Sequence, residues 1–267
     1  MRNSKRYLNN LKITYNIEWC ILIVLLLIPF VSFCYIDTKS IIHYEINFVD
    51  AFCQGKIWDF YQFCYDKVQY YLQEGIPGNH YATYDFPLHI VLGIWGIPLY
   101  MFCWHTSIEV TDSMLGLIYG KSIYIVALII SSYVLYRICL SLELDKEIAK
   151  YCPFLFCSSI LVYSSICIMG QSDVIGMIFI LCGIDAYINQ KDRMFLFWFM
   201  IAVPFKMYAL FIFVPLLLLR HKSILKILGK GLLEVFELEL VFAKSFGQFF
   251  QIEIYLVSTY MKSVFLI

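Results

Sequence analysis

The chain has 267 residues, of which 61% are hydrophobic and only 15% are charged. A soluble domain is nearer half apolar and a quarter charged, so this composition excludes an ordinary soluble globular protein and favours a membrane protein. The formal net charge of +0 gives no global field that would attract nucleic acid, so no nucleic-acid partner is expected.

The first apolar run covers residues 19–36 and follows a basic segment with four Lys or Arg residues among the first twelve positions. The run is too long for a signal peptide, and no small-residue cleavage site follows it. It is therefore predicted to be an uncleaved transmembrane helix. The positive-inside rule places the N-terminus in the cytoplasm and Asp37, which follows the run, on the far side.

Residues 37–87 form the longest polar stretch and are predicted to be a long outer loop. Within it, Ile42, Ile46 and Val49 recur at helical spacing, which predicts a short amphipathic helix lying on the membrane surface. Cys53 and Cys64 lie in this polar segment and could pair in an oxidising compartment. The other eight cysteines lie in or beside apolar runs and are predicted to be small buried hydrophobic side chains.

Further apolar runs follow at 88–104, 122–140, 153–169, 174–188 and 194–219. Several are shorter than the ~20 residues that a membrane span needs, which is typical of short or broken helices that line cavities in membrane proteins. The predicted fold class is therefore all-α, a polytopic integral membrane bundle. Residues 227–267 contain several charges and no uninterrupted span, so they are predicted to be a separate amphipathic or aberrant tail after a module formed by residues 1–226.

Two topologies remain open for the second half. Counting one span per run places Gln171 and Asp173 on the cytoplasmic side. Alternatively, residues 194–219 form a hairpin broken near Lys206, which places these residues on the far side with Asp37. The hairpin is preferred because it explains why a proline and a lysine interrupt this run in its middle.

Polar side chains inside apolar runs indicate a site. Lys206 lies in the middle of a long apolar run, where a lysine costs ~3 kcal/mol on insertion scales, so it is expected to face a cavity or an anionic partner. Gln171 and Asp173 lie between two apolar runs. An N-cap role for the following helix would explain Asp173 but not Gln171.

The order of these features resembles the GT-C class of integral-membrane glycosyltransferases, which includes mannosyltransferase-like and protein O-mannosyltransferase-like enzymes. An acid, Asp37, follows the first helix, and the segment TYDFPL at 83–88 looks like the family's Tyr-x-x-Pro motif before the second helix. The segment MGQSD at 169–173 looks like its Gly-Gln-x-Asp motif, and the run around Lys206 looks like its lysine-containing helix.

The resemblance implies a GT-C-like helical bundle that transfers a sugar from a polyprenyl-phosphate carrier to a glycan, lipid or protein hydroxyl on the outer face. Asp37 would then be the general base that takes the acceptor proton. Gln171 and Asp173 would hold sugar hydroxyls or place the acceptor, and Lys206 would pair with the carrier phosphate.

By the same resemblance, Tyr84 and Asp85 would close the loop over the cleft, and Asp50 would be a second acid. Whether the protein needs a divalent metal is left open, because some relatives bind one and many do not. Relatives usually continue with several more helices, so a C-terminally truncated relative, with its activity in question, is expected. The expected location is a bacterial plasma membrane, with membrane lipid as a partner.

Two other readings remain open. A transporter or lipid-linked sugar flippase would also use broken helices and charges in the membrane. The lack of a visible inverted repeat and the single long outer loop argue against it. The other reading is an inactive, truncated fragment of a glycosyltransferase.

Overall fold

The computed structural model describes residues 2–36, 38–75, 81–82, 84–106 and 113–220. These residues are helical or lie in turns and short links, and none of them forms a strand, which confirms the all-α prediction. Asp37 and the tail at 227–267 lie outside the described residues.

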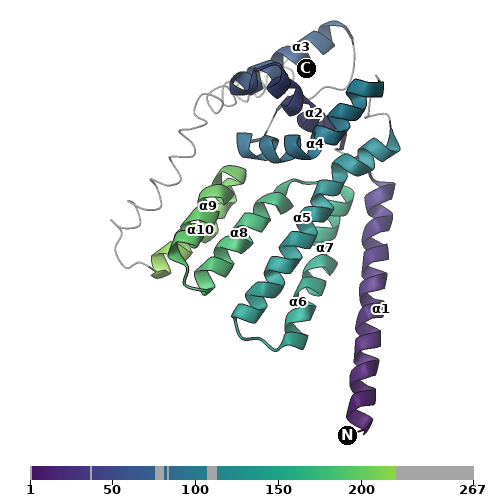
Figure 1. The fold of residues 1–267 in the computed structure, drawn as a ribbon, viewed down its shortest axis with the longest axis vertical. Helices are drawn as coiled ribbons and strands as arrows, with labels where there is room; N and C mark the ends of the chain where they lie inside the picture. Colours follow the sequence, from purple (N-terminus) through teal and green to yellow (C-terminus); the bar gives the residue numbers. More distant parts are fainter. Residues whose placement is uncertain (1, 37, 76–80, 83, 107–112, 221–267) are drawn as a thin grey trace, which may run out of the picture.

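The helices follow one another with short connections (Figure 1). In chain order they are α1 (Arg2–Ser32), α2 (Thr38–Cys53), η1 (Ile57–Asp59), α3 (Phe60–Gln73), α4 (Phe86–Thr106), α5 (Met114–Ser141), α6 (Lys146–Ser158), α7 (Ile160–Val162), η3 (Tyr163–Ile168), α8 (Asp173–Ile188), α9 (Asp192–Phe205), η4 (Met207–Ala209) and α10 (Leu210–Arg220). Helices α5 to α10 run alongside one another with α1 at one edge, while α2, α3 and α4 gather at one end of this bundle.

Two of the described helices are long and apolar enough to cross a membrane, namely α4 over Phe86–His105 and α5 over Met114–Ser141. Lys146–Ser158 and Ile160–Ile168 together would make a third span, bent by 45°. Among the residues whose side chains the structure describes, the apolar part of α1 is Ile17–Ser32, and the helix ends at Ser32, before the predicted boundary at residue 36. Its membrane crossing therefore stays a prediction.

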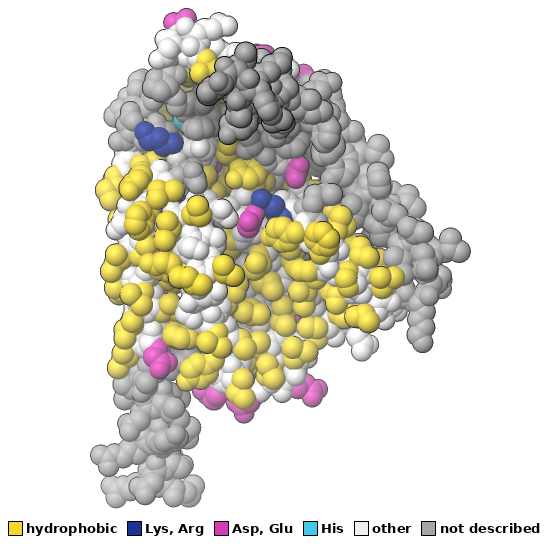
Figure 2. Space-filling view, turned by 180° about the vertical axis from the view of Figure 1, so that it is seen from behind, with side chains coloured by type: hydrophobic (Ala, Val, Ile, Leu, Met, Phe, Trp, Pro, Cys, Tyr) yellow, Lys and Arg dark blue, Asp and Glu magenta, His cyan; other side chains and the backbone are white. Residues whose placement is uncertain are grey.

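Apolar side chains cover much of the outer surface of the bundle (Figure 2). Large exposed hydrophobic residues occur on several helices, including Ile28 of α1, Ile129 of α5, Leu161 of α7 and Phe211 of α10. A surface this apolar is unusual for a soluble monomer and suits contact with lipid.

The predicted amphipathic helix in the outer loop is present as α2, but it does not lie apart from the bundle. Ile42 is fully buried, and α2 packs against α4 and α5. Glycines allow this close packing: a Cβ on Gly96 of α4 would lie 2.5 Å from Cβ of Glu45, and one on Gly120 of α5 would lie 2.6 Å from Cγ1 of Ile42. Its apolar stripe thus meets helices of the same chain, and its position at the membrane surface stays a prediction.

The predicted break in the last apolar run is confirmed. Helix α9 ends at Phe205, Lys206 adopts an extended backbone conformation, and α10 then runs back beside α9. The guanidinium of Arg220, at the end of α10, pairs with Asp192 at the start of α9, and its Nη1 donates to the Tyr187 carbonyl at 3.1 Å. The run therefore forms the preferred hairpin. Which end of it faces the cytoplasm stays a prediction.

All ten cysteines are free. The suggested Cys53–Cys64 pair is not formed, because Cys53 is exposed while Cys64 is buried in the cluster around Phe60 and Phe86. We predicted that the cysteines in apolar runs are small buried hydrophobic side chains. This is confirmed for Cys34, Cys139, Cys157 and Cys167, whereas Cys20 is exposed.

Candidate functional site

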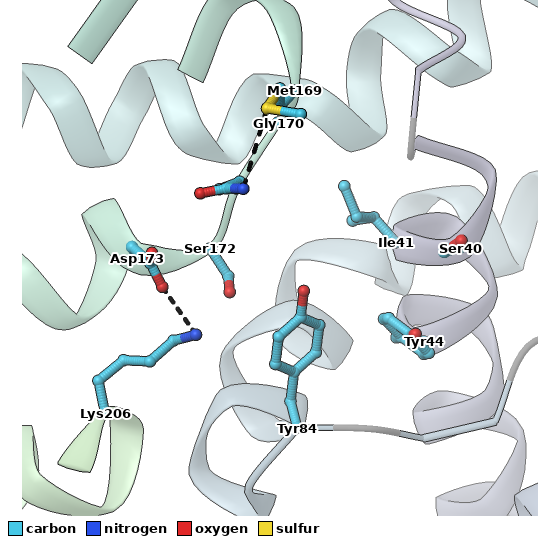
Figure 3. Close-up of a pocket in the computed structure, with 10 residues that line it drawn as sticks. Ser40, Ile41, Tyr44, Tyr84, Met169, Gly170, Ser172, Asp173 and Lys206 are labelled. Atoms are coloured by element: carbon cyan, nitrogen blue, oxygen red, sulfur yellow. Dashed lines mark hydrogen bonds and ion pairs between the residues drawn. The ribbon is translucent and has the colours of Figure 1, made fainter. Parts of the chain in front are cut away.

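A cavity of about 360 Å³ lies where α2, the segment before α4, the turn into α8 and the end of α9 meet (Figure 3). Segments that are far apart in the sequence contribute to it. Its lining consists of Ser40, Ile41, Tyr44, Tyr84, Met169, Gly170, Gln171, Ser172, Asp173 and Lys206. Four of the predicted site residues, Tyr84, Gln171, Asp173 and Lys206, are therefore together in one hollow.

Lys206 reaches the cavity from the break between α9 and η4. Its Nζ lies 2.7 Å from Oδ1 of Asp173 and 5.3 Å from the centre of the Tyr84 ring. Lys206 thus has both the cavity and the anionic partner expected from its position in an apolar run. The two side chains are 27% and 44% exposed, so water screens this ion pair and its net contribution to stability is small. A ligand can displace such a pair.

The turn from residue 170 to residue 173 places the polar groups on the other side of the cavity. Gly170 has a φ of 64°, in the left-handed region, and the Gln171 backbone N–H donates to the Ser165 carbonyl at 2.8 Å. The Gln171 side chain is exposed, and among the described residues its amide makes only a long contact, at 4.0 Å, with the Met169 sulfur. Its amide is therefore available to hydrogen-bond a ligand.

Asp173 was considered as the N-cap of the following helix, but that position belongs to Ser172. Asp173 is the first residue of α8, where a carboxylate interacts favourably with the positive end of the helix dipole. Ser172 is 3% exposed, and its hydroxyl makes no capping hydrogen bond. Sequence reasoning did not single out this serine, since a serine in a turn between helices is common.

Tyr84 is fixed on the opposite wall by its neighbours. The Tyr61 hydroxyl donates to the Tyr84 carbonyl at 2.7 Å. The Tyr84 ring packs edge-on against Tyr44 with ring centres 5.6 Å apart, and it also contacts the buried His89 ring at 6.3 Å. The outer-loop helices α2 and α3 thus hold a ring against the Lys206 ammonium.

Lys121 of α5 supports the cavity from behind, and sequence reasoning missed it. Its side chain is fully buried, and its Nζ donates to the carbonyls of Phe33, Cys167 and Ile168, each at 2.9 Å. The same ammonium therefore links the end of α1, α5 and the π-helical turn that precedes Gly170. This role was hard to predict, because Lys121 adjoins an apolar run at its edge, where a lysine is common.

Glu45 of α2 is a second buried ionisable group that the sequence did not reveal. It is fully buried, and neither carboxyl oxygen has a hydrogen-bond partner among the described residues. Burial raises the pKa of this carboxyl well above its ordinary value. Glu45 packs against Gly96 of α4 and Gly120 of α5, and it is not among the residues that line the cavity.

Two of the predicted residues do not line the cavity. Asp50 lies at the end of α2 that faces α3, where Lys67 Nζ pairs with its carboxylate at 2.8 Å and Gln54 donates to it at 3.0 Å. These partners account for Asp50 structurally, and its suggested role as a second acid stays a prediction. Asp85 follows Tyr84 but is absent from the lining, and Asp37 lies outside the described residues.

Within the described part of the chain, no group of three or more His, Cys, Asp or Glu side chains is arranged to hold a metal ion. The cavity instead offers one ammonium, one carboxylate, an amide and several hydroxyls, a set suited to a polar ligand with oxygen atoms. Comparison of the chain with protein-family models, with curated proteins and with solved structures found no match.

Proposed function

We propose that this protein is a membrane glycosyltransferase that takes a sugar from a polyprenyl-phosphate carrier and transfers it to a hydroxyl of a glycan, lipid or protein. The observation that carries the proposal is the convergence of Tyr84, Gln171, Asp173 and Lys206 on one cavity. The sequence resemblance implied these residues as substrate contacts before their positions were known. They come from three separate segments, and packing of the apolar helices alone does not require them to meet.

The chemistry follows from the groups around the cavity. The acceptor oxygen attacks the anomeric carbon of the sugar, and the bond from that carbon to the carrier phosphate breaks, with the electron pair leaving on the phosphate oxygen. The ammonium of Lys206 stabilises this developing charge in a site partly shielded from water. The Gln171 amide donates hydrogen bonds to sugar hydroxyls and accepts them, the Asp173 carboxylate accepts them, and the Tyr84 ring packs against the sugar.

Asp37 is proposed as the base that takes the acceptor proton. Ser40, three residues later in the chain, lines the cavity, so the segment that follows α1 leads into the site. The carrier's hydrocarbon chain would lie along the apolar outer surface of the bundle.

The test is a transfer assay on membranes that contain the full-length chain, with a radiolabelled polyprenyl-phosphate sugar as donor. Lys206→Gln is expected to lower product formation at least 100-fold, because a cation at the leaving group is worth about 3 kcal/mol. Lys150→Gln is the matched control, since Lys150 pairs with Glu147 on an exposed helix surface. Transport of the labelled lipid without a new glycosidic bond would contradict the proposal and favour a flippase.

A further inference from the structure

The N-terminus of α8 opens onto the cavity without the cap that its sequence offers. The first amides of a helix have no partner inside the helix, and a serine at the N-cap usually accepts a hydrogen bond from one of them. Ser172 occupies this position in α8, yet its backbone is already helical, with φ −70° and ψ −8°, and its hydroxyl caps nothing. The Ile175 N–H donates to the Ser172 carbonyl at 3.0 Å, so among the described backbone hydrogen bonds the amides of Asp173 and Val174 are the donors left at the start of α8.

The Ser172 hydroxyl itself points to a ligand. The residue is 97% buried, and its Oγ has no hydrogen-bond partner among the described residues. Figure 3 shows the hydroxyl directed into the cavity, between the Lys206–Asp173 pair and the Tyr84 ring. Leaving a buried hydroxyl unpaired is unfavourable, so a ligand that hydrogen-bonds to it gains affinity from this group.

The groups at this place share one chemical character, since each of them donates hydrogen bonds. They are the Ser172 hydroxyl, the first amides of α8 and the Lys206 ammonium, 2.7 Å from the Asp173 carboxylate. A phosphate group has several acceptor oxygens and a negative charge, which match a helix N-terminus and an ammonium together. The Asp173 carboxylate now takes the position that such a ligand would need beside Lys206.

We infer that a phosphate group binds at the start of α8, where it accepts hydrogen bonds from Ser172 Oγ and the first amides of the helix. The phosphate then replaces Asp173 as the ion-pair partner of Lys206. Asp173 is then an internal counter-anion, which neutralises Lys206 in the empty site and competes with the incoming phosphate. The inference rests on the proposed function only for the source of that phosphate. It involves no covalent step.

Binding is measured by titration calorimetry on the full-length chain in a neutral maltoside detergent. The probes are inorganic phosphate and dodecyl phosphate, with dodecanol as the uncharged control. Ser172→Ala is expected to weaken binding about 10-fold, because a hydrogen bond to a charged group is lost. Ser164→Ala is the matched control: its hydroxyl donates to the Leu161 carbonyl on an exposed surface away from the cavity.

Asp173→Asn provides the second test, because a gain in affinity cannot result from misfolding. Removal of the competing carboxylate is expected to strengthen phosphate binding about 10-fold. Unchanged or weaker binding by Asp173→Asn, or wild-type binding by Ser172→Ala, would overturn the inference.

The two probes separate the sources of the phosphate. Binding of dodecyl phosphate alone assigns the site to a lipid headgroup, binding of both probes shows that a free phosphate suffices, and binding of neither overturns the inference. Phosphate binding without any sugar transfer would leave this site in place while removing the proposed glycosyltransferase function.

Discussion

At the scale of single residues, the site illustrates which polar side chains a sequence reveals. Lys206 was predictable because a lysine in the middle of an apolar run is unfavourable unless something compensates it, and Asp173 does so at 2.7 Å. Ser172, Glu45 and Lys121 were not predictable. Their burial depends on which helices pack around them, and the residues next to them in the sequence do not indicate this packing.

The turn at Gly170 gives a residue-scale prediction. A side chain here meets both the left-handed φ of 64° and the Lys121 side chain, whose Cε would lie 3.3 Å from the new Cβ. Gly55 has a similar φ of 70° but open space around it. Gly55→Ala should therefore cost only the backbone strain of about 1 kcal/mol, and Gly170→Ala about 1 kcal/mol more.

Chemical unfolding of both glycine variants in detergent micelles measures this difference. Equal losses of stability would mean that Lys121 does not press against the turn, and the packing described behind the cavity would be wrong.

Glu45 gives a prediction about pH. Because burial raises its pKa, the folded chain binds this proton more tightly than the unfolded chain. Its contribution to stability is therefore fully present at acidic pH and is lost as the pH rises from the ordinary carboxyl range towards the raised pKa of the folded state. Glu45→Gln should remove this pH dependence, and Glu45→Met should also raise stability at neutral pH by about 1–3 kcal/mol, because no unpaired oxygen remains buried.

Thermal unfolding between acidic and neutral pH tests the Glu45 prediction. Glu147→Gln is the control, because Glu147 is exposed and pairs with Lys150. A Glu45→Gln variant that keeps the wild-type pH profile would show that this carboxyl does not titrate differently in the folded state.

At the scale of elements, the sequence predicted the helices formed by apolar runs and the break in the last of these runs, but it did not predict α3, which lies in the polar outer loop. Apolar runs of sufficient length predicted α4 and α5, and Pro204 with Lys206 predicted the end of α9. The packing partners of α2 were not predictable. An amphipathic stripe shows that a helix buries one face, and it leaves open whether the face meets lipid or, as here, α4 and α5.

Lys121 gives the prediction at this scale, because it joins α5 to the end of α1 and to the turn before α8. Lys121→Met keeps most of the side-chain volume but leaves three carbonyls without their donor. A loss of about 2–4 kcal/mol of stability is expected, with weaker phosphate binding as the turn loosens. Lys146→Met, at an exposed helix start, should change stability by less than about 0.5 kcal/mol. Equal stability of the two variants would show that Lys121 is not a structural link.

At the scale of the whole molecule, the described residues combine an apolar outer surface with a polar cavity where α2 meets the turn into α8. Composition alone predicted the first of these, since 61% of the residues are hydrophobic. The cavity was only partly predictable. The sequence pointed to Tyr84, Gln171, Asp173 and Lys206 one at a time, and the hairpin of α9 and α10 together with the packing of α2 brings them together.

The central claim is that α2 and the turn into α8 open into one cavity on one side of the membrane. Single cysteines at Ser40 and Gln171, which line the cavity from α2 and from this turn, test it most directly. Sealed vesicles of known orientation are treated with a membrane-impermeant maleimide. Mass spectrometry then measures the extent of labelling at each introduced cysteine separately from the native cysteines. The account predicts that both positions react from the same side and that dodecyl phosphate slows both reactions. Reaction of the two positions from opposite sides would contradict it.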